Sequence, residues 1–286
     1  MRKSGEGEVI VGRHTRISDE AEIIFAKPGR LTIGDYCVIG PGVRFICAGG
    51  DIEIDDWTTL HDRCLVMSGQ GVKVGQHGWF GQNAILDGTG GLTIGNGVRV
   101  GMYSQIWSHV AAGEQIEGCT LYGERPVVIE DDVWLVGSCI VASGVTIGAR
   151  TVALIGSNIT KSWPEKMVIA GSPAAAKSLS FYKDLELDDK FRMLQGWVDE
   201  ILPTIPGCVR LEAPEPDEQV LLADSAGEAP SFIFAKRTAT ADELRARFPE
   251  ATVCCIEDKR YEKKFTRLEP LILKPLAGNK ARFLRR

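Results

Sequence analysis

The chain has 286 residues, of which 25% are charged and 44% hydrophobic, and its net charge at pH 7 is −5. These values are ordinary for a globular protein, and the negative charge gives no reason to expect nucleic acid or an anionic membrane as partner. No stretch approaches the roughly 20 apolar residues of a membrane-spanning helix, and the first residues lack the apolar segment of a signal peptide. We therefore expect a cytoplasmic protein.

A six-residue period dominates residues 11–159. Aliphatic or phenylalanine side chains recur at every sixth position in sets of three, and only Ala153 among them is small. The sets are Val11, Ile17, Ile23; Ile33, Ile39, Phe45; Ile54, Leu60, Val66; Val74, Phe80, Leu86; Ile94, Val100, Ile106; Ile129, Leu135, Val141; and Ile147, Ala153, Ile159. This period fits neither an α-helix nor a flat amphipathic strand. It predicts a mainly β fold, in which short strands and corners form about seven triangular coils of a parallel β-helix.

A small or β-branched residue stands four positions after most of these apolar residues and is also expected to point inward. Cys37, Cys64 and Cys139 occupy this position, where cysteine acts as a compact hydrophobic side chain. The chain has no C-x-x-C motif, and Cys254 and Cys255 are adjacent, so the eight cysteines do not suggest a disulfide framework.

Extra residues always follow the third member of a set, so they are expected to project from one corner of the β-helix. The longest insertion separates Ile106 from Ile129, a step of 23 residues where six are expected. About seventeen residues therefore leave the coil near 107–128, and loops of this length usually carry function.

The six-residue period stops after Pro173. Residues 179–203 show amphipathic helical spacing that ends at Pro203, and residues 204–286 combine strand-like apolar runs with a helix expected from Thr240 to Phe248, with Thr240 as its cap. We expect a β-helix at 1–178, a helical linker at 179–203 and a small α/β module at 204–286. The module shows no catalytic motif and could serve packing, oligomerisation or acceptor binding.

Residues 74–178 resemble the hexapeptide-repeat O- and N-acetyltransferases of the galactoside, maltose and capsular-sugar branch. The matching stretches are residues 80–87, 92–101, 129–134, 144–148, 159–161 and 169–173. The resemblance implies a left-handed β-helix, a homotrimer with each active site between neighbours, and acyl transfer from acetyl-CoA to a sugar, nucleotide-sugar or glycan acceptor. It implies neither a metal nor a tightly bound cofactor.

The resemblance also implies a general base at His109, at the start of the long insertion. The chemistry agrees, because acyl transfer to a hydroxyl or amine needs a base that works near neutral pH, and imidazole suits this role. The thioester is already activated, so direct attack by the acceptor needs no covalent enzyme intermediate. A backbone N–H near the thioester oxygen would stabilise the oxyanion.

The resemblance assigns further residues to the two substrates. Asn83 and Asp87 are expected to bind the acceptor, and Trp134 to line the acyl path. The coenzyme A site is expected to comprise Gly137, Ile155, Thr160, Lys161 and Lys177. From the residues alone, Trp134 could equally serve packing, and each lysine could be an ordinary solvated charge.

Three other classes of protein use similar repeats. A γ-class carbonic anhydrase would need three zinc-binding histidines, and its His-x-x-x-x-His pair is absent here. A sugar-1-phosphate nucleotidyltransferase would need a glycine-rich nucleotide domain, which is also missing. A non-catalytic β-helix scaffold stays open, although the histidine in the long insertion and the motifs between Trp134 and Pro173 argue against it.

Overall fold

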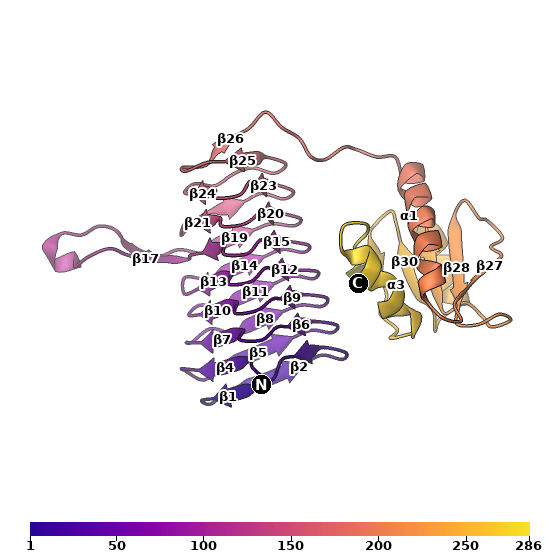
Figure 1. Ribbon diagram of the computed structural model, residues 1–286, viewed down its shortest axis with the longest axis horizontal. Coiled ribbons are helices and arrows are strands. Elements are labelled where there is room, and N and C mark those ends of the chain that lie inside the picture. Colours follow the sequence, from indigo (N-terminus) through magenta and orange to yellow (C-terminus); the bar gives the residue numbers. More distant parts are fainter. The chain divides into compact units, whose positions relative to one another are not determined.

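The computed structural model describes residues 1–286 as two compact units, Met1–Tyr182 and Lys183–Arg286. The first unit is the left-handed parallel β-helix that the six-residue period predicts (Figure 1). The helix expected within 179–203 is α1, Leu187–Ile201, and it belongs to the second unit. None of the helices combines the length and apolar character needed to cross a membrane.

Three sheets form the walls of the β-helix. Wall A contains β1 (Arg2–Ser4), β4 (Glu22–Phe25), β7 (Arg44–Cys47), β10 (Leu65–Ser68), β13 (Ile85–Gly88), β16 (Gln105–Ile106), β21 (Ile140–Val141) and β24 (Asn158–Ile159). Wall B contains β2 (Glu8–Val11), β5 (Arg30–Ile33), β8 (Ile52–Ile54), β11 (Val72–Val74), β14 (Leu92–Ile94), β19 (Val127–Ile129) and β22 (Thr146–Ile147). Wall C contains β3 (Arg16–Ile17), β6 (Val38–Ile39), β9 (Thr59–Leu60), β12 (Trp79–Phe80), β15 (Arg99–Val100), β20 (Trp134–Leu135), β23 (Val152–Ala153), β25 (Val168–Ala170) and β26 (Ala175–Ala176).

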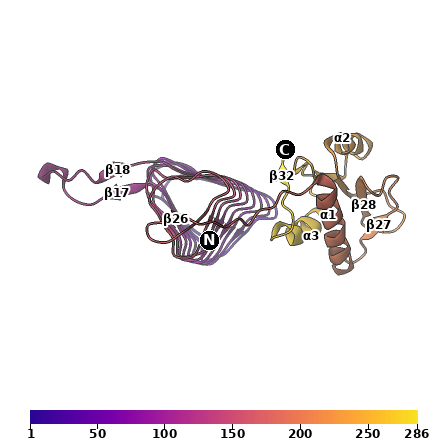
Figure 2. The same cartoon turned by 90° about the horizontal axis from the view of Figure 1, so that it is seen from above.

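The chain passes from wall B to wall C and then to wall A in every coil, so equivalent positions of successive coils stack in parallel register. Leu86, for example, pairs with Val66 below it and with Ile106 above it, and all three are fully buried. The interior seen along the axis in Figure 2 is filled by such side chains. Close packing along the axis explains why the repeat tolerates so few small residues at these positions.

The predicted inward cysteines are confirmed, because Cys37, Cys64 and Cys139 have no exposed surface. Burial raises the pKa of the Cys37 thiol to about 12 and that of Cys64 to about 11. Both therefore stay protonated near neutral pH, and a buried thiol is a poor nucleophile.

The insertions leave the β-helix at the corner between walls A and B, as their spacing predicts. Short turns follow β4, β7, β10 and β13, and residues 107–126 leave the same corner between β16 and β19. This corner, called the A/B corner below, carries the projecting hairpin of Figure 1. The other two corners are the B/C and C/A corners.

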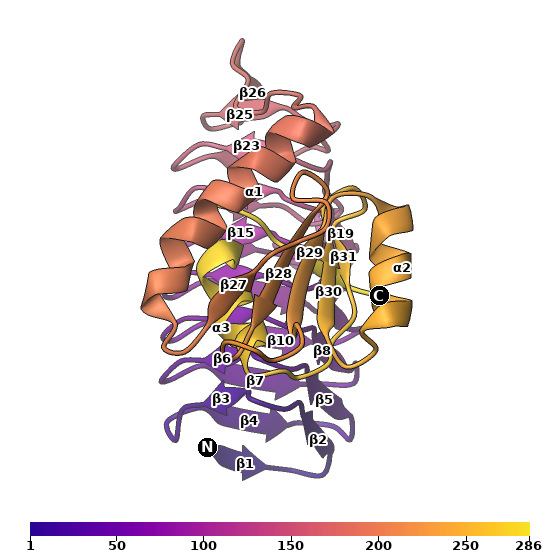
Figure 3. The same cartoon turned by 90° about the vertical axis from the view of Figure 1, so that its right-hand side faces the viewer.

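The second unit is an α/β module built on one six-stranded sheet. Its strands are β27 (Val209–Leu211), β28 (Gln219–Ala223), β29 (Phe232–Ala235), β30 (Thr252–Cys255), β31 (Arg260–Tyr261) and β32 (Leu284–Arg285). The remaining elements are η2 (Leu202–Thr204), α2 (Thr238–Arg247) and α3 (Leu268–Ala277). Ile233 and Val253 pack under α2, whereas α1 and α3 lie on the other face of the sheet (Figures 2 and 3).

Helix α2 begins two residues before the expected Thr240, and Thr240 is not its cap. The Glu257 carboxylate accepts hydrogen bonds from the Thr238 backbone N–H at 2.8 Å and from its hydroxyl at 2.9 Å. A carboxylate at this end also suits the helix dipole. The cap comes from a residue 19 positions later, so a local capping motif could not predict it.

Candidate functional site

The long insertion is a β-hairpin that carries His109 at its base. Strand β17 (His109–Ala111) pairs antiparallel with β18 (Tyr122–Glu124), and the 3-10 helix η1 (Gln115–Glu117) lies near the tip. His109 stands opposite Glu124 in this pairing. Gln70 of an earlier coil donates a hydrogen bond to the Glu124 carboxylate at 2.8 Å. This bond fixes the base of the hairpin against the β-helix.

His109 forms a hydrogen-bonded pair with Asp87 on wall A. The His109 Nδ1 to Asp87 Oδ2 distance is 2.8 Å, and the two side chains are 37% and 0% exposed. The imidazole therefore reaches solvent while its partner is buried. The ring also contacts Trp107 edge-on, with 5.8 Å between ring centroids.

Each oxygen of the Asp87 carboxylate accepts hydrogen bonds from one backbone N–H and one hydroxyl. Oδ2 accepts the backbone N–H of Ser108 at 2.8 Å and its hydroxyl at 3.0 Å. Oδ1 accepts the backbone N–H of Thr89 at 3.1 Å and its hydroxyl at 2.5 Å. Every one of these groups stabilises the ionised carboxylate.

Burial and hydrogen bonding act on the pKa of Asp87 in opposite directions. Burial raises the pKa, but hydrogen bonds from Thr89, His109 and Ser108 outweigh it, so the pKa lies below its ordinary value. Asp87 is therefore ionised at neutral pH and can only accept a hydrogen bond from His109. The imidazole must carry its proton on Nδ1, which leaves the Nε2 lone pair available as a base.

The predicted contact between Asp87 and the acceptor needs revision. Its side chain is fully buried and both oxygens are occupied by protein donors. Asp87 contacts His109 instead of solvent, and it lies in the coil just below the hairpin. Its Thr89 partner could have been anticipated, because Asp side chains often accept backbone N–H groups two residues on. Nothing in the local sequence signals Ser108.

The remaining histidines lie at other corners. His14 and His77 belong to a ring stack at the B/C corner with Tyr36 and Trp57, whose successive centroids are 5.1, 4.2 and 6.1 Å apart. His61 lies at the C/A corner, edge-on to Trp79. His109 is thus the histidine of the A/B corner.

Four of the other predicted residues lie at or beside the C/A corner. Asn83 occupies the turn between β12 and β13, and Gly137 occupies the same corner in a later coil. Ile155 lies one coil beyond Gly137 and is 73% exposed. Trp134 points outward from wall C and is 44% exposed. Wall A separates this group from His109 within one chain.

The other predicted coenzyme residues lie near the last coil. Thr160 and Lys161 follow β24 at the A/B corner, and the Lys161 ammonium lies 4.7 Å from the centre of the Trp163 ring. Lys177 follows β26, beyond the last complete coil. Within a single chain, Asp87 contacts His109, but the residues predicted to bind coenzyme A do not lie together.

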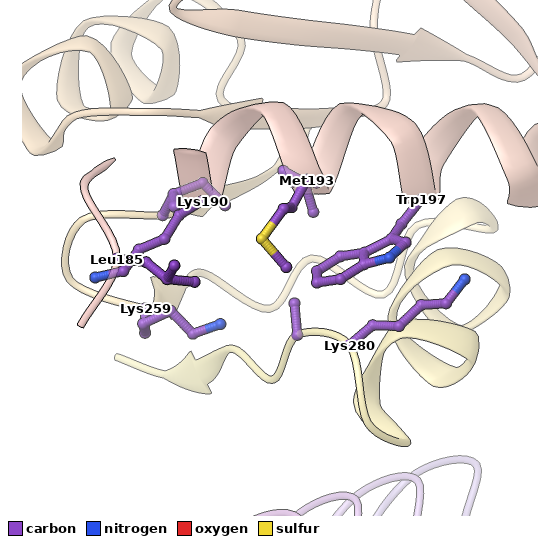
Figure 4. A pocket seen from close by; sticks show the side chains of 9 residues that line it. Leu185, Lys190, Met193, Trp197, Lys259 and Lys280 are labelled. Atoms are coloured by element: carbon purple, nitrogen blue, oxygen red, sulfur yellow. The ribbon is translucent and has the colours of Figure 1, made fainter. Parts of the chain in front are cut away.

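A separate pocket of about 140 Å³ lies in the second unit (Figure 4). Its wall includes Leu185, Lys190, Met193, Leu194, Trp197, Ile256, Lys259, Lys280 and Ala281. None of the predicted site residues belongs to it. The pocket wall contains three lysines, and the ammonium of one of them, Lys280, is paired with Glu200.

Comparison with known proteins relates the chain to enzymes. WcaF of Escherichia coli, by name an acetyltransferase of colanic acid biosynthesis, is 33% identical over 105 residues, which are 36% of this chain and 56% of WcaF. Nodulation protein L of Rhizobium meliloti is 33% identical over 111 residues, which are 38% of this chain and 60% of that protein. The chain's homologues include sugar O-acetyltransferases of the hexapeptide-repeat family.

These alignments span less than two thirds of the relatives' own lengths. No protein-family model matches the chain. Among solved structures, the polysialic acid O-acetyltransferase OatWY is similar over 64% of this chain and 93% of its own, with 19% identity and a TM-score of 0.46.

Proposed function

We propose that the protein transfers an acetyl group from acetyl-CoA to a hydroxyl or amine of a sugar, nucleotide-sugar or glycan. The observation that supports this most is the His109–Asp87 pair, which leaves a solvent-accessible imidazole with its Nε2 lone pair free. The acetyltransferase homologues support the same chemistry. A structural scaffold would have no need of a buried carboxylate that orients an exposed histidine.

The reaction follows from this geometry. Nε2 of His109 removes the proton from the acceptor as its oxygen or nitrogen attacks the thioester carbonyl carbon. Asp87 stabilises the imidazolium that forms, because its carboxylate already accepts the Nδ1 proton. The tetrahedral intermediate then collapses, the C–S bond breaks, and the proton on Nε2 passes to the sulfur of coenzyme A.

The donor is proposed to lie along the C/A corner. The exposed Ile155 and the side-chain-free Gly137 leave backbone there that a pantetheine arm could contact, and Trp134 stands beside that corner. Thr160 lies at the A/B corner of the last coil, so it would contact a part of the coenzyme that extends past this stretch. Lys161 and Lys177 pair with no carboxylate, so both are available for the coenzyme phosphates.

Because the donor corner and His109 lie on either side of wall A, we propose a homotrimer in which one chain supplies His109 and its neighbour the donor corner. The outward side chains of wall A favour such an interface. Ile24, Ile46 and Met67 form one apolar column in successive coils, whereas the matching column of wall B contains Thr32, Glu53 and Lys73. Closed cyclic symmetry is the usual arrangement of homo-oligomers.

Light scattering after size exclusion should give the mass of three chains. Ile46→Asp should shift this mass towards one chain, because it places a charge in the apolar column of wall A. Thr32→Asp, on the outward face of wall B, is the matched control and should leave the trimer intact. A wild-type protein that is active as a monomer would contradict the interfacial site.

A panel of neutral, amino, acidic and nucleotide-linked sugars, assayed with acetyl-CoA for release of free thiol, tests the function itself. We expect acceptor-dependent thiol release that requires His109, and acetylated product in the same reaction. Absence of acceptor-dependent release across the panel would favour the scaffold. All eight cysteines are free thiols, which fits the cytoplasm that we propose as the compartment.

A further inference from the structure

The C/A corner carries a polar and aromatic cluster that the mechanism above does not explain. Arg63, Asn83 and Tyr103 occupy the same corner position in three successive coils, with φ of +58°, +59° and +61°. This left-handed region is unfavourable for residues other than glycine, although asparagine tolerates it. The repeated backbone conformation presents the three side chains one above another. We call these three residues the corner cluster.

Arg63 is held in place by its neighbours in the adjoining coils. Its Nε donates a hydrogen bond to the Asn83 side-chain oxygen at 3.0 Å. Its stem lies against Gly42 of the coil below, where a Cβ atom would come within 3.1 Å of the Arg63 Cγ. The guanidinium is thus partly ordered before any ligand arrives, which lowers the entropic cost of binding.

The charge of Arg63 has no partner within the protein. It is exposed, and no carboxylate pairs with it. Since Asn83 uses the Nε proton, the two terminal nitrogens are left for a ligand. These two parallel N–H groups match the two oxygens of a carboxylate or phosphate, and such charge-assisted, bidentate pairs are strong.

Exposed aromatic side chains lie on the same corner and on the adjoining wall. Tyr103 is 56% exposed and Trp79, on the adjoining wall C, is 38% exposed. Aromatic rings with a polar edge pack well against ligands that have both apolar and polar faces, and sugar rings are ligands of this kind. The cluster therefore combines a cation, an amide and an aromatic surface.

We infer that the corner cluster binds an acidic sugar, one that carries a carboxylate or a phosphate, with its anionic group on Arg63. The inference rests on the proposed function and adds the charge of the acceptor to it. Tyr103 lies in the coil next to that of Gly137, since the Ser138 backbone N–H donates to the Met102 carbonyl at 2.9 Å. The acidic sugar would then lie on the same corner as the proposed donor, in the coils immediately below.

Arg63→Met, which keeps the stem and removes the charge, tests the inference. It should raise the KM for an acidic acceptor by about 10- to 100-fold, the effect of losing a charge-assisted hydrogen bond, and raise the KM for a matched neutral acceptor much less. Arg63→Lys should raise the KM for the acidic acceptor by an intermediate factor, because lysine keeps the charge but lacks the two parallel N–H groups of the guanidinium. Arg16→Met, at an exposed arginine of the first coil, is the control. Melting temperatures near that of the wild type verify that each variant is folded.

Two acidic acceptors show whether Arg63 binds a carboxylate or a phosphate. A galacturonate oligosaccharide and a galactose phosphate are each compared with neutral galactose oligosaccharide. Preference for either acid, lost in Arg63→Met, supports the inference and identifies the group. Equal rates for acidic and neutral acceptors in the wild type, or an equal loss for both in Arg63→Met, would overturn it.

Calorimetric titration of the same saccharides separates this inference from the proposed function, because it needs no turnover. If no acceptor releases thiol but the acidic saccharide binds to wild type and Arg16→Met and not to Arg63→Met, the acidic-sugar site stands and the acetyltransferase proposal fails. If neutral sugars are acetylated while acidic saccharides show no binding that depends on Arg63, the acidic-sugar site is wrong and the proposed function stands.

Discussion

His109→Ala is expected to lower kcat by about 10²- to 10⁴-fold, the usual contribution of a general base. The KM for acetyl-CoA should change little, because the imidazole acts on the acceptor and not on the coenzyme. A loss of kcat without a loss of donor binding marks an interaction used mainly in the transition state. Steady-state kinetics of thiol release with both substrates varied measures the two constants.

Two of the other histidines test this assignment of the base. His61→Ala and His77→Ala are the controls, since both histidines lie at other corners. If one of these controls abolishes turnover while His109→Ala keeps most of it, the base lies elsewhere.

Asp87→Asn is expected to reduce kcat by about 10²- to 10⁴-fold while His109 stays in place. An amide that donates its N–H to Nδ1 favours the imidazole tautomer with the proton on Nε2, so the base loses its free lone pair. The fall in kcat should therefore approach that of His109→Ala, and the double variant should be little worse than either single one. Additive losses in the double variant would show that Asp87 does not act through His109.

The same substitution should also lower the free energy of unfolding at pH 7, by about 2–4 kcal/mol, because Ser108 loses its charged acceptor and Thr89 then donates to a neutral amide oxygen. The pKa of Asp87 is lower in the folded state than in the unfolded state. The ionised Asp87 carboxylate therefore contributes to the free energy of unfolding above the ordinary aspartate pKa of about 3.9. This contribution is lost as the pH falls through the pKa that Asp87 has in the folded state.

Urea unfolding of wild type and Asp87→Asn at pH 7 and at successively lower pH measures this effect. The difference in the free energy of unfolding between wild type and Asp87→Asn should be largest near neutral pH and should shrink below about pH 4. Asp19→Asn, at a fully exposed aspartate, is the control and should change neither stability nor rate appreciably. A difference that stays constant down to acid pH would mean that the ionised carboxylate is not what stabilises the fold.

Most of the first unit follows from the sequence by itself. The six-residue period determines the strands, the inward positions such as Leu86 and Cys64, and the corner from which all insertions leave, because each strand and corner forms within a few residues. The same spacing places His109 at the A/B corner. These features repeat locally, so a sequence pattern records them.

Only the tertiary structure decides which side chains meet between coils. Asp87 and His109 are 22 residues apart, Arg63 and Asn83 are 20 apart, and the Glu257 cap of α2 lies 19 residues from Thr238. Each contact depends on the register in which one strand or coil lies beside the next, and on whether a side chain points inward, outward or along a corner. Asp87 shows the physical reason most clearly. Its burial and its lowered pKa come from donors on the adjoining coil and hairpin as well as from nearby Thr89, and no local pattern predicts them.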